Sequence, residues 1–293
     1  MSDASAPPLH AFSEALADAV ASAERSMVEV HSRRLRASGF AYGPDLIVTA
    51  DEALAESGPV EVVLPGGEPR PAAIVGRDPS TDVALLRVEG TGFAPLALEP
   101  RSVRAGSLAV TVGARHGAAL ASLGIVASAG PAWRSLRGGA IDARLELDLR
   151  LPREAEGSLV LDAGGAALGM AVFGPRRRVL VIPATTVARV ADVLERRGHV
   201  PRGYLGLGLQ TVAVEDGTRG AMVMSVAPDG PGAHAGVLQG DVLVAWDGGP
   251  VTDVAALLRG LGPESVGRAV VLGLRRAGGL TELTLTVGER PRG

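Results

Sequence analysis

Short apolar runs separated by turns are the feature that most constrains the fold of this chain. Such runs recur along its first two thirds, for example at residues 27–30, 83–88, 108–112 and 124–128, and a further strand is predicted at 204–209. Turn-forming stretches such as Gly43-Pro44-Asp45 separate them, and the chain holds 40 Gly and 20 Pro. Many short strands at regular spacing are typical of β-sandwiches and β-barrels. We therefore expect a mostly β fold.

Helical spacing of apolar residues is confined to a few segments. It predicts an amphipathic helix within residues 9–25, a second over 186–197, and a third near 253–261. The short segment 199–203, which contains Pro201, is predicted to be a stiff linker. We therefore predict an N-terminal helical segment over 1–25, a large β domain over 26–198 and a smaller α+β domain over 203–290.

Composition excludes several kinds of chemistry. The chain contains no Cys and no Lys, so a Cys nucleophile, a Ser–Lys pair and a Schiff base are ruled out. The formal net charge of -3 argues against binding to nucleic acid. No apolar run is long enough to span a membrane, and residues 1–25 lack the pattern of a signal peptide. From these observations we expect a cytoplasmic protein that needs no cofactor.

Four groups of segments, in this order, resemble the HtrA/Deg family of trypsin-like proteases with PDZ domains. The segment at 37–49 is similar to the family's strand pair before the catalytic histidine, and 78–88 to the segment that holds the catalytic aspartate. The resemblance implies a trypsin-like double β-barrel followed by a PDZ-like α+β domain. The remaining matches are at 110–113 with 124–127, and at 202–207 with 230–251.

Carried over residue by residue, the resemblance places unusual side chains at the catalytic positions. Asp82 matches the catalytic aspartate, whereas Glu52 stands where the family has histidine. Ala155 matches the nucleophilic serine, and Arg153 matches the glycine that opens the oxyanion hole. In a serine-type triad the histidine takes the proton of the serine, and the aspartate only orients and stabilises the histidine. The serine mechanism therefore lacks its base and its nucleophile.

On this reasoning we expect a protein that is not an enzyme, a pseudoprotease that acts by binding peptides or proteins as a scaffold, a chaperone-like holder or a regulator of an active paralogue. The first alternative is a serine-type endopeptidase of the same family with non-standard residues, for which Ser158 is a candidate nucleophile, or a carboxylate-based hydrolase. The second alternative is a purely structural subunit.

Other charged residues have alternative interpretations. Glu52 and Asp82 should lie close together, where two carboxylates share a proton, act as acid and base, or bind a metal. We expect no metal, because the sequence offers no third ligand. His116 is expected in a loop and not as a base. Arg176-Arg177-Arg178 is predicted to be a solvated turn, and contact with an acidic partner is the alternative.

The PDZ-like segment carries the predicted binding site. In such domains a peptide C-terminus adds as a strand to a sheet edge, and loop N–H groups hold its carboxylate. The resemblance implies that this loop is Tyr204-Leu205-Gly206-Leu207, and that Val254, Leu257 and Leu258 of the facing helix form an apolar pocket. We therefore predict partners with an apolar C-terminal residue. A homotrimer formed through the N-terminal segment, around Phe12, is also expected from the resemblance.

Overall fold

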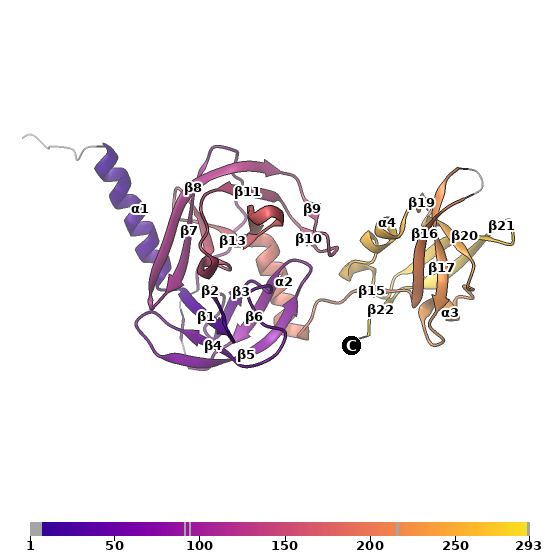
Figure 1. Ribbon diagram of the computed structural model, residues 1–293, viewed down its shortest axis with the longest axis horizontal. Helices are drawn as coiled ribbons and strands as arrows, with labels where there is room; N and C mark the ends of the chain where they lie inside the picture. Colours follow the sequence, from indigo (N-terminus) through magenta and orange to yellow (C-terminus); the bar gives the residue numbers. More distant parts are fainter. Residues whose placement is uncertain (1–7, 91, 94, 215–216, 292–293) are drawn as a thin grey trace, which may run out of the picture. The chain divides into compact units, whose positions relative to one another are not determined.

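The computed structural model describes residues 8–90, 92–93, 95–214 and 217–291. The chain divides into two compact units, Met1–Val200 and Pro201–Gly293. The first unit contains two closed barrels of six strands each, and the second contains a single main sheet (Figure 1). The predicted fold class, a trypsin-like double barrel followed by a PDZ-like domain, is confirmed.

The first barrel is closed in the strand order β1-β2-β3-β6-β5-β4. Apolar side chains fill its centre, among them Phe40, Ile47 and Leu85, which are fully buried. All four positions of β3 and the first four of β6 are buried, so these two strands are covered on both faces. The strands are β1 (Met27–Ser32), β2 (Leu35–Ala41), β3 (Leu46–Thr49), β4 (Val60–Val63), β5 (Pro69–Asp78) and β6 (Val83–Arg87).

The second barrel is closed in the order β11-β14-β13-β12-β7-β8. Strands β7 and β8 form the longest hairpin of this barrel, and β8 continues through the position where the sequence predicted only 124–128. The strands are β7 (Leu108–Arg115), β8 (Ala118–Gly130), β11 (Arg144–Asp148), β12 (Leu159–Asp162), β13 (Ala167–Phe173) and β14 (Val179–Pro183). Between them lie β9 (Trp133–Arg134), β10 (Ala140–Ile141) and two 3-10 turns, η1 (Arg153–Ala155) and η2 (Pro175–Arg177).

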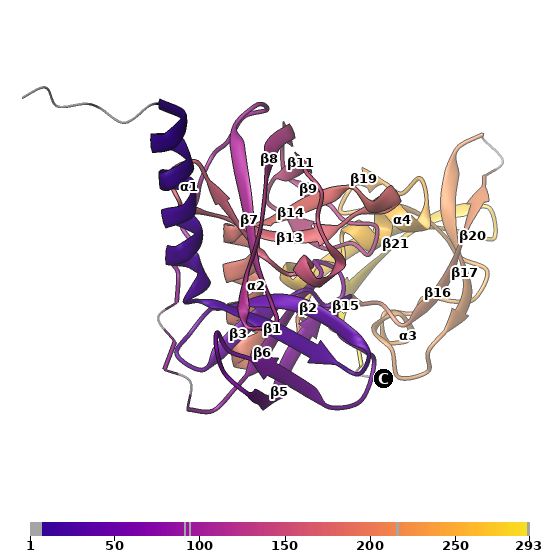
Figure 2. The ribbon, with the colours of Figure 1, turned by 60° about the vertical axis from the view of Figure 1, so that its left-hand side comes forward.

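Two helices belong to this unit (Figure 2). Helix α1 (Pro8–Glu24) packs with its C-terminal part against β7 and β8. Helix α2 (Ala184–Arg197) packs against β5, β6 and β13, and Val187, Val190 and Leu194 form its buried face. It ends at Gly198, which is in the left-handed conformation, as a glycine after the last turn favours. None of the described helices is long and apolar enough to cross a membrane.

The second unit is built around one sheet in the order β16-β17-β18-β20-β21. The strand predicted at 204–209 is interrupted at Gly206, which has a φ of +71° and separates β15, which pairs with β22, from β16, which pairs with β17. Leu243, Leu272 and Leu274 are fully buried on the inner face of the sheet. The strands are β15 (Gly203–Tyr204), β16 (Leu207–Ala213), β17 (Arg219–Val226), β18 (Val242–Trp246), β19 (Gly249–Pro250), β20 (Ala269–Arg276), β21 (Gly279–Thr286) and β22 (Gly288–Glu289), and the helices and 3-10 turn are α3 (Pro231–His234), α4 (Val254–Arg259) and η3 (Pro263–Ser265).

Candidate functional site

Glu52 and Asp82 lie side by side at one end of the first barrel. Glu52 is in the turn that follows β3, and Asp82 is in the turn that joins β5 to β6. Strands β3 and β6 are neighbours in the barrel, so their ends bring the two turns together. The backbone N–H of Glu52 donates a hydrogen bond to Oδ1 of Asp82 at 2.8 Å. The predicted proximity of these two residues is therefore present in the structure.

A third carboxylate, which the sequence did not indicate, joins this pair. Glu156 follows η1 in the second barrel, and Glu52, Asp82 and Glu156 each place one carboxylate oxygen within 4.8 Å of the others. Three carboxylates at this spacing have the ligand type and the separation that could hold a divalent cation. The only signal in the sequence was the alternation Arg153-Glu154-Ala155-Glu156, which does not reveal which glutamate turns inward.

Burial changes the charge of this cluster. Burial, together with the neighbouring carboxylates of Glu156, Glu52 and Asp51, raises the pKa of the Asp82 carboxyl to about 8 against the opposing effect of the Glu52 N–H. Burial also raises the pKa of Glu156. Glu52 is exposed and pairs with Arg137, Oε1 to Nη2, at 3.3 Å. The site thus combines a proton-holding acid, Asp82, with an exposed carboxylate, Glu52.

The turn η1 holds the two positions that matched the nucleophile and the oxyanion hole. Ala155 is buried, whereas Arg153 is exposed. The N–H of Ala155 donates to the carbonyl of Pro152 at 3.0 Å, and the N–H of Glu156 donates to that of Arg153 at 3.1 Å. An oxyanion hole needs N–H groups aimed at the substrate. Here these two are used within the turn itself.

Ser158, the alternative nucleophile, is fully buried. Among the described residues, its Oγ is the buried side-chain oxygen or nitrogen that has no hydrogen-bond partner. A side chain with no exposed surface cannot be reached by a peptide bond in this conformation. Ser158 is therefore a packed strand-entry residue and does not fit the role of nucleophile.

Replacing Ser158 with alanine is expected to raise the free energy of unfolding by about 0.5–1 kcal/mol, because it removes a buried hydroxyl that lacks a partner. The matched control is Ser38→Ala. The Oγ of Ser38 donates to the Glu154 carbonyl at 2.7 Å and accepts from the Ala114 N–H at 3.0 Å, so its loss should destabilise by about 1–3 kcal/mol. Urea unfolding of both variants checks this, and a less stable Ser158→Ala protein would contradict it.

A hollow of about 440 Å³ opens beside the carboxylate cluster. Both barrels contribute to its wall, the first through the β1–β2 turn and the turn after β3, the second through η1 and η2. Arginines and glutamates dominate this wall. The lining residues are Arg34, Leu35, Arg36, Glu52, Ala53, Arg153, Glu154, Glu156, Phe173 and Arg177.

His116 and the arginine run 176–178 both lie in turns between strands. His116 is in the β7–β8 hairpin, where its backbone N–H donates to Oε2 of Glu29 at 3.0 Å. It is therefore a turn residue that connects the hairpin to β1. In the arginine run, Arg176 and Arg177 have φ values of +58° and +57°, and the guanidinium of Arg177 lies 4.4 Å from the centre of the Phe173 ring. Arg178 pairs with Glu146 at 3.0 Å.

The second unit contains the predicted peptide site. The main sheet ends at β16, which pairs with β17 on one side. Leu205 and Gly206 precede β16, and within the described residues neither of their N–H groups donates a hydrogen bond. Their carbonyls are engaged instead, by Gly232 at 2.7 Å and by Ala227 at 2.8 Å. The loop is thus fixed by its carbonyls while its N–H groups stay available.

Helix α4 lies next to β16. Asp253 caps its N-terminus by accepting from the Ala256 N–H at 2.6 Å. Leu257 faces the core and is buried, Val254 is half-buried, and Leu258 is 56% exposed. Of the three predicted pocket residues, Leu258 and Val254 therefore have accessible apolar surface. Leu257 belongs to the core of the unit.

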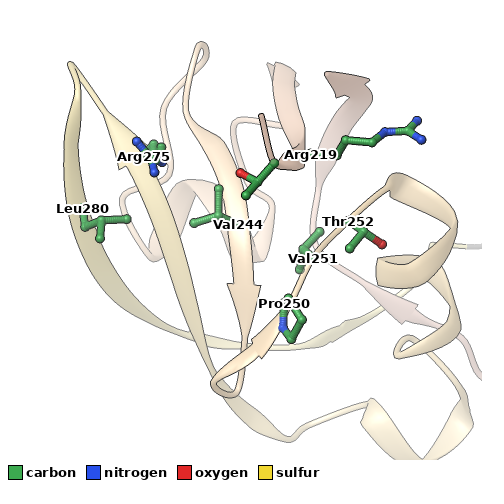
Figure 3. A pocket seen from close by; sticks show the side chains of 8 residues that line it. Arg219, Val244, Pro250, Val251, Thr252, Arg275 and Leu280 are labelled. Carbon is green, nitrogen blue, oxygen red and sulfur yellow. The ribbon is translucent and has the colours of Figure 1, made fainter. Parts of the chain in front are cut away.

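A further pocket of the second unit is separate from the predicted peptide site. It measures about 420 Å³ and does not include Val254, Leu257 or Leu258. Figure 3 shows Val244 of β18 at its centre, Leu280 and Arg275 of the β20–β21 hairpin on one side, and Val251 on the other. Its remaining lining residues are Thr218, Arg219, Pro250 and Thr252.

Comparison with known proteins agrees with both units. The family description "Trypsin-like peptidase domain" matches residues 37–170, and "PDZ domain" matches residues 203–287. The chain belongs to the HtrA/Deg family. It is 31% identical to a probable periplasmic serine endoprotease DegP-like of Bartonella henselae, over 84% of this chain and 52% of that protein. With a protein of the same name from Brucella suis the identity is 29%, over 87% of this chain and 52% of the relative.

Solved structures of this family share the fold. An HtrA-type protease AlgW with decapeptide superposes with a TM-score of 0.74 at 22% identity, covering 94% of this chain and 99% of that one. A serine endoprotease from Yersinia pestis gives a TM-score of 0.72 at 24% identity, covering 94% and 98%. The chain spans about half the length of the DegP-like relatives.

Two expectations from the sequence are contradicted by these relatives. The expectation that the chain is not an enzyme is wrong as drawn, because the relatives are named serine endoproteases. That expectation followed from the loss of the serine and the histidine, and the structure adds Glu156 to the two carboxylates, Glu52 and Asp82, that the sequence had placed together. The expectation of a cytoplasmic location is contradicted by the word periplasmic in the names of the DegP-like relatives. The composition of residues 1–25 does not decide the compartment.

Proposed function

We propose that this HtrA/Deg-family protein captures the C-terminal ends of peptides on its PDZ domain. The observation that carries this proposal is the pair of unused N–H groups at Leu205 and Gly206, directly before the edge strand β16. Two adjacent N–H donors can hold a terminal carboxylate, and an edge strand can pair with the peptide backbone. AlgW, which shares the fold, is named as a complex with a decapeptide.

The side chains beside the edge strand favour an apolar last residue. Val254 and Leu258 present apolar surface on α4, which lies next to β16, and the Val254 N–H donates to the hydroxyl of Thr211 in β16 at 3.1 Å. An apolar pocket beside a carboxylate site distinguishes between peptides by the apolar area that the last side chain buries. Each Å² of that area stabilises the complex by about 25 cal/mol. Peptides that end in Val or Leu should therefore bind more tightly than those that end in Asp or Ser.

This proposal is tested with fluorescein-labelled peptides that end in Val or Leu, prepared with a free C-terminal carboxylate and as amides. Anisotropy with the full chain should show at least about tenfold weaker binding of the amides, equivalent to about 1.4 kcal/mol. Equal affinity of acids and amides would show that the Leu205–Gly206 loop does not hold the carboxylate.

A second candidate function is endopeptidase activity in the double-barrel unit. The specific observations are the names of the relatives and the acid–base cluster at the positions of the triad. Because Ala155 carries no hydroxyl, the attacking group would be a water molecule. Glu52 would take a proton from that water as its oxygen bonds to the peptide carbonyl carbon, and protonated Asp82 would give its proton to the carbonyl oxygen. Glu52 would then give its proton to the amide nitrogen while Asp82 takes one back from a hydroxyl of the tetrahedral intermediate, so that the C–N bond breaks and the amine leaves.

Replacing Glu52 with glutamine is expected to lower the rate of casein cleavage by at least about 100-fold, because the general base is removed. Glu68→Gln, an exposed glutamate of the β4–β5 turn, is the matched control and should leave the rate unchanged. A fluorophosphonate, which labels activated serines, should not label the protein. Lack of cleavage by the wild-type chain would overturn this candidate and leave the peptide-capture proposal standing.

We also infer a periplasmic location from the names of the relatives. Assembly as a trimer through α1 stays a prediction. It is supported by the apolar side chains that α1 presents to solvent, Leu9 at 79% and Phe12 at 41% exposure.

A further inference from the structure

The hollow between the two barrels is lined by four arginines, on three separate segments. Arg34 and Arg36 lie at the β1–β2 turn, Arg153 in η1 and Arg177 in η2. These segments are far apart in the sequence, and only closure of the two barrels next to each other brings them to one cavity. A cavity wall with this many guanidinium groups is unusual for a peptide-binding cleft and calls for an account of their partners.

Some charges around the hollow are already compensated within the protein. Arg36 pairs with Glu29 at 3.0 Å. Glu52 pairs with Arg137 at 3.3 Å. The charges of two lining residues, Arg36 and Glu52, are therefore neutralised by partners within the protein.

The remaining arginines are available to a ligand. Within the described residues, the side chains of Arg34 and Arg153 form no hydrogen bond or ion pair, and all three of Arg34, Arg153 and Arg177 are exposed. Arg177 stacks on Phe173 at 4.4 Å, a contact that uses the face of the guanidinium and leaves its N–H donors at the edge.

The acidic residues of the wall do not cancel these arginines. Once the pairs formed by Arg36 and Glu52 are set aside, Glu154 and Glu156 are the remaining glutamates of the wall. Three arginines, Arg34, Arg153 and Arg177, therefore line the hollow together with two glutamates, so the wall has an excess of positive side chains.

The backbone of η2 adds an independent observation. Arg176 and Arg177 both have positive φ values, a conformation that costs an L-residue of this size roughly 1 kcal/mol or more. The turn is held in this shape by hydrogen bonds from the Arg177 N–H to the Gly174 carbonyl at 3.0 Å and from the Gly174 N–H to the Arg178 carbonyl at 2.8 Å. The effect is to place the Arg177 side chain at the hollow, over Phe173.

We propose that this hollow binds an acidic side chain of a peptide, an aspartate or glutamate whose carboxylate is held between Arg153 and Arg177, with Arg34 at the rim. This inference rests on the proposed function as a peptide-binding protein. It adds that the peptides bound by the double-barrel unit carry an acidic side chain. Guanidinium groups bind carboxylates through paired N–H donors, and a side chain that reaches into the cavity from an extended peptide needs no change in the fold. The PDZ domain would then bind the C-terminus of the peptide, and the double-barrel unit would bind an internal acidic residue.

The test uses fluorescein-labelled decapeptides with an amidated C-terminus, which removes capture by the PDZ domain. One set carries two central Asp or Glu residues, and the matched set carries Asn or Gln. With the full wild-type chain at low salt, the acidic peptides should bind at least tenfold more tightly. The double variant Arg153→Gln with Arg177→Gln should lose that preference.

The matched control is Arg101→Gln with Arg104→Gln, two exposed arginines of the segment before β7, which changes the net charge by the same amount. It should retain the preference for acidic peptides. Equal binding of the acidic and amide sets by the wild type, or equal loss in both double variants, would overturn the proposal. Peptides with a free apolar C-terminus, measured in parallel, report on the PDZ site separately, so failure there is distinguished from failure of the arginine site.

Discussion

Replacing Gly206 with valine is expected to weaken binding of C-terminal peptides by at least about tenfold, or about 1.4 kcal/mol. Gly206 has a φ of +71°, which a β-branched residue adopts only with strain. A Cβ at this position would also lie 2.8 Å from the Cα of Gly230, which is a backbone atom and cannot turn aside. The loop must therefore shift, and the N–H groups of Leu205 and Gly206 move with it.

Gly279→Val is the matched control for this substitution. Gly279 lies in the same unit, its φ is not positive, and a Cβ there would meet its nearest neighbour, the carbonyl oxygen of Arg276, at 3.7 Å. It should bind peptides as the wild type does. Circular dichroism of both variants establishes that the PDZ domain is folded. Unchanged affinity in a folded Gly206→Val protein would mean that the terminal carboxylate is held elsewhere.

Replacing Asp82 with asparagine is expected to have little effect near pH 4 and to stabilise the protein at high pH. The gain is about 1.4 kcal/mol for each pH unit between 3.8 and about 8, or up to about 6 kcal/mol at pH 9. The pKa of Asp82 is raised to about 8 in the folded state, from an ordinary value of 3.8. The folded state therefore holds a proton that the unfolded state releases above pH 4. The stability that comes from this proton is fully present below the unfolded pKa and is lost as pH rises to about 8.

Asparagine is neutral at every pH, so the variant avoids this loss. Its side-chain oxygen can still accept from the Glu52 N–H, and asparagine tolerates the positive φ of +57° at this position. The control is Asp45→Asn, an exposed carboxylate paired with Arg87 at 3.0 Å. Urea unfolding between pH 4 and pH 9 should show a difference between Asp82→Asn and wild type that grows with pH, and none that grows for Asp45→Asn. If the free energies of unfolding of Asp82→Asn and wild type changed with pH in the same way, the raised pKa of Asp82 would be contradicted.

The same titration bears on the endopeptidase candidate. A protonated Asp82 is the acid in the water-based reaction, so activity should fall as pH rises through about 8. Stability would then decline between about pH 4 and 8, and activity would decline as pH rises through about 8, because both depend on the same proton. A cleavage activity that keeps rising above pH 9 would assign the acid to another group.

Much of the fold was predictable because local rules fix strands and turns. The short apolar runs of β3 and β6 are bounded by turn residues, and these boundaries determine where the strands begin and end. The double barrel and the PDZ sheet follow once those strands are identified with the family. The break in the strand predicted at 204–209 was not predicted, since it depends on the left-handed conformation of Gly206, which glycine permits but does not enforce.

The sequence by itself determined which chemical groups the site has. It placed a glutamate at position 52 and an alanine at position 155, and it excluded thiol and lysine chemistry throughout the chain. Tertiary structure alone decided how those groups act. Glu156 joins Glu52 and Asp82 only because two barrels close against each other, and burial there, not residue type, raises the pKa of Asp82. The sequence fixes which side chain stands at each position. Burial and the distances between side chains set their charge and reactivity, and both exist only in the folded protein.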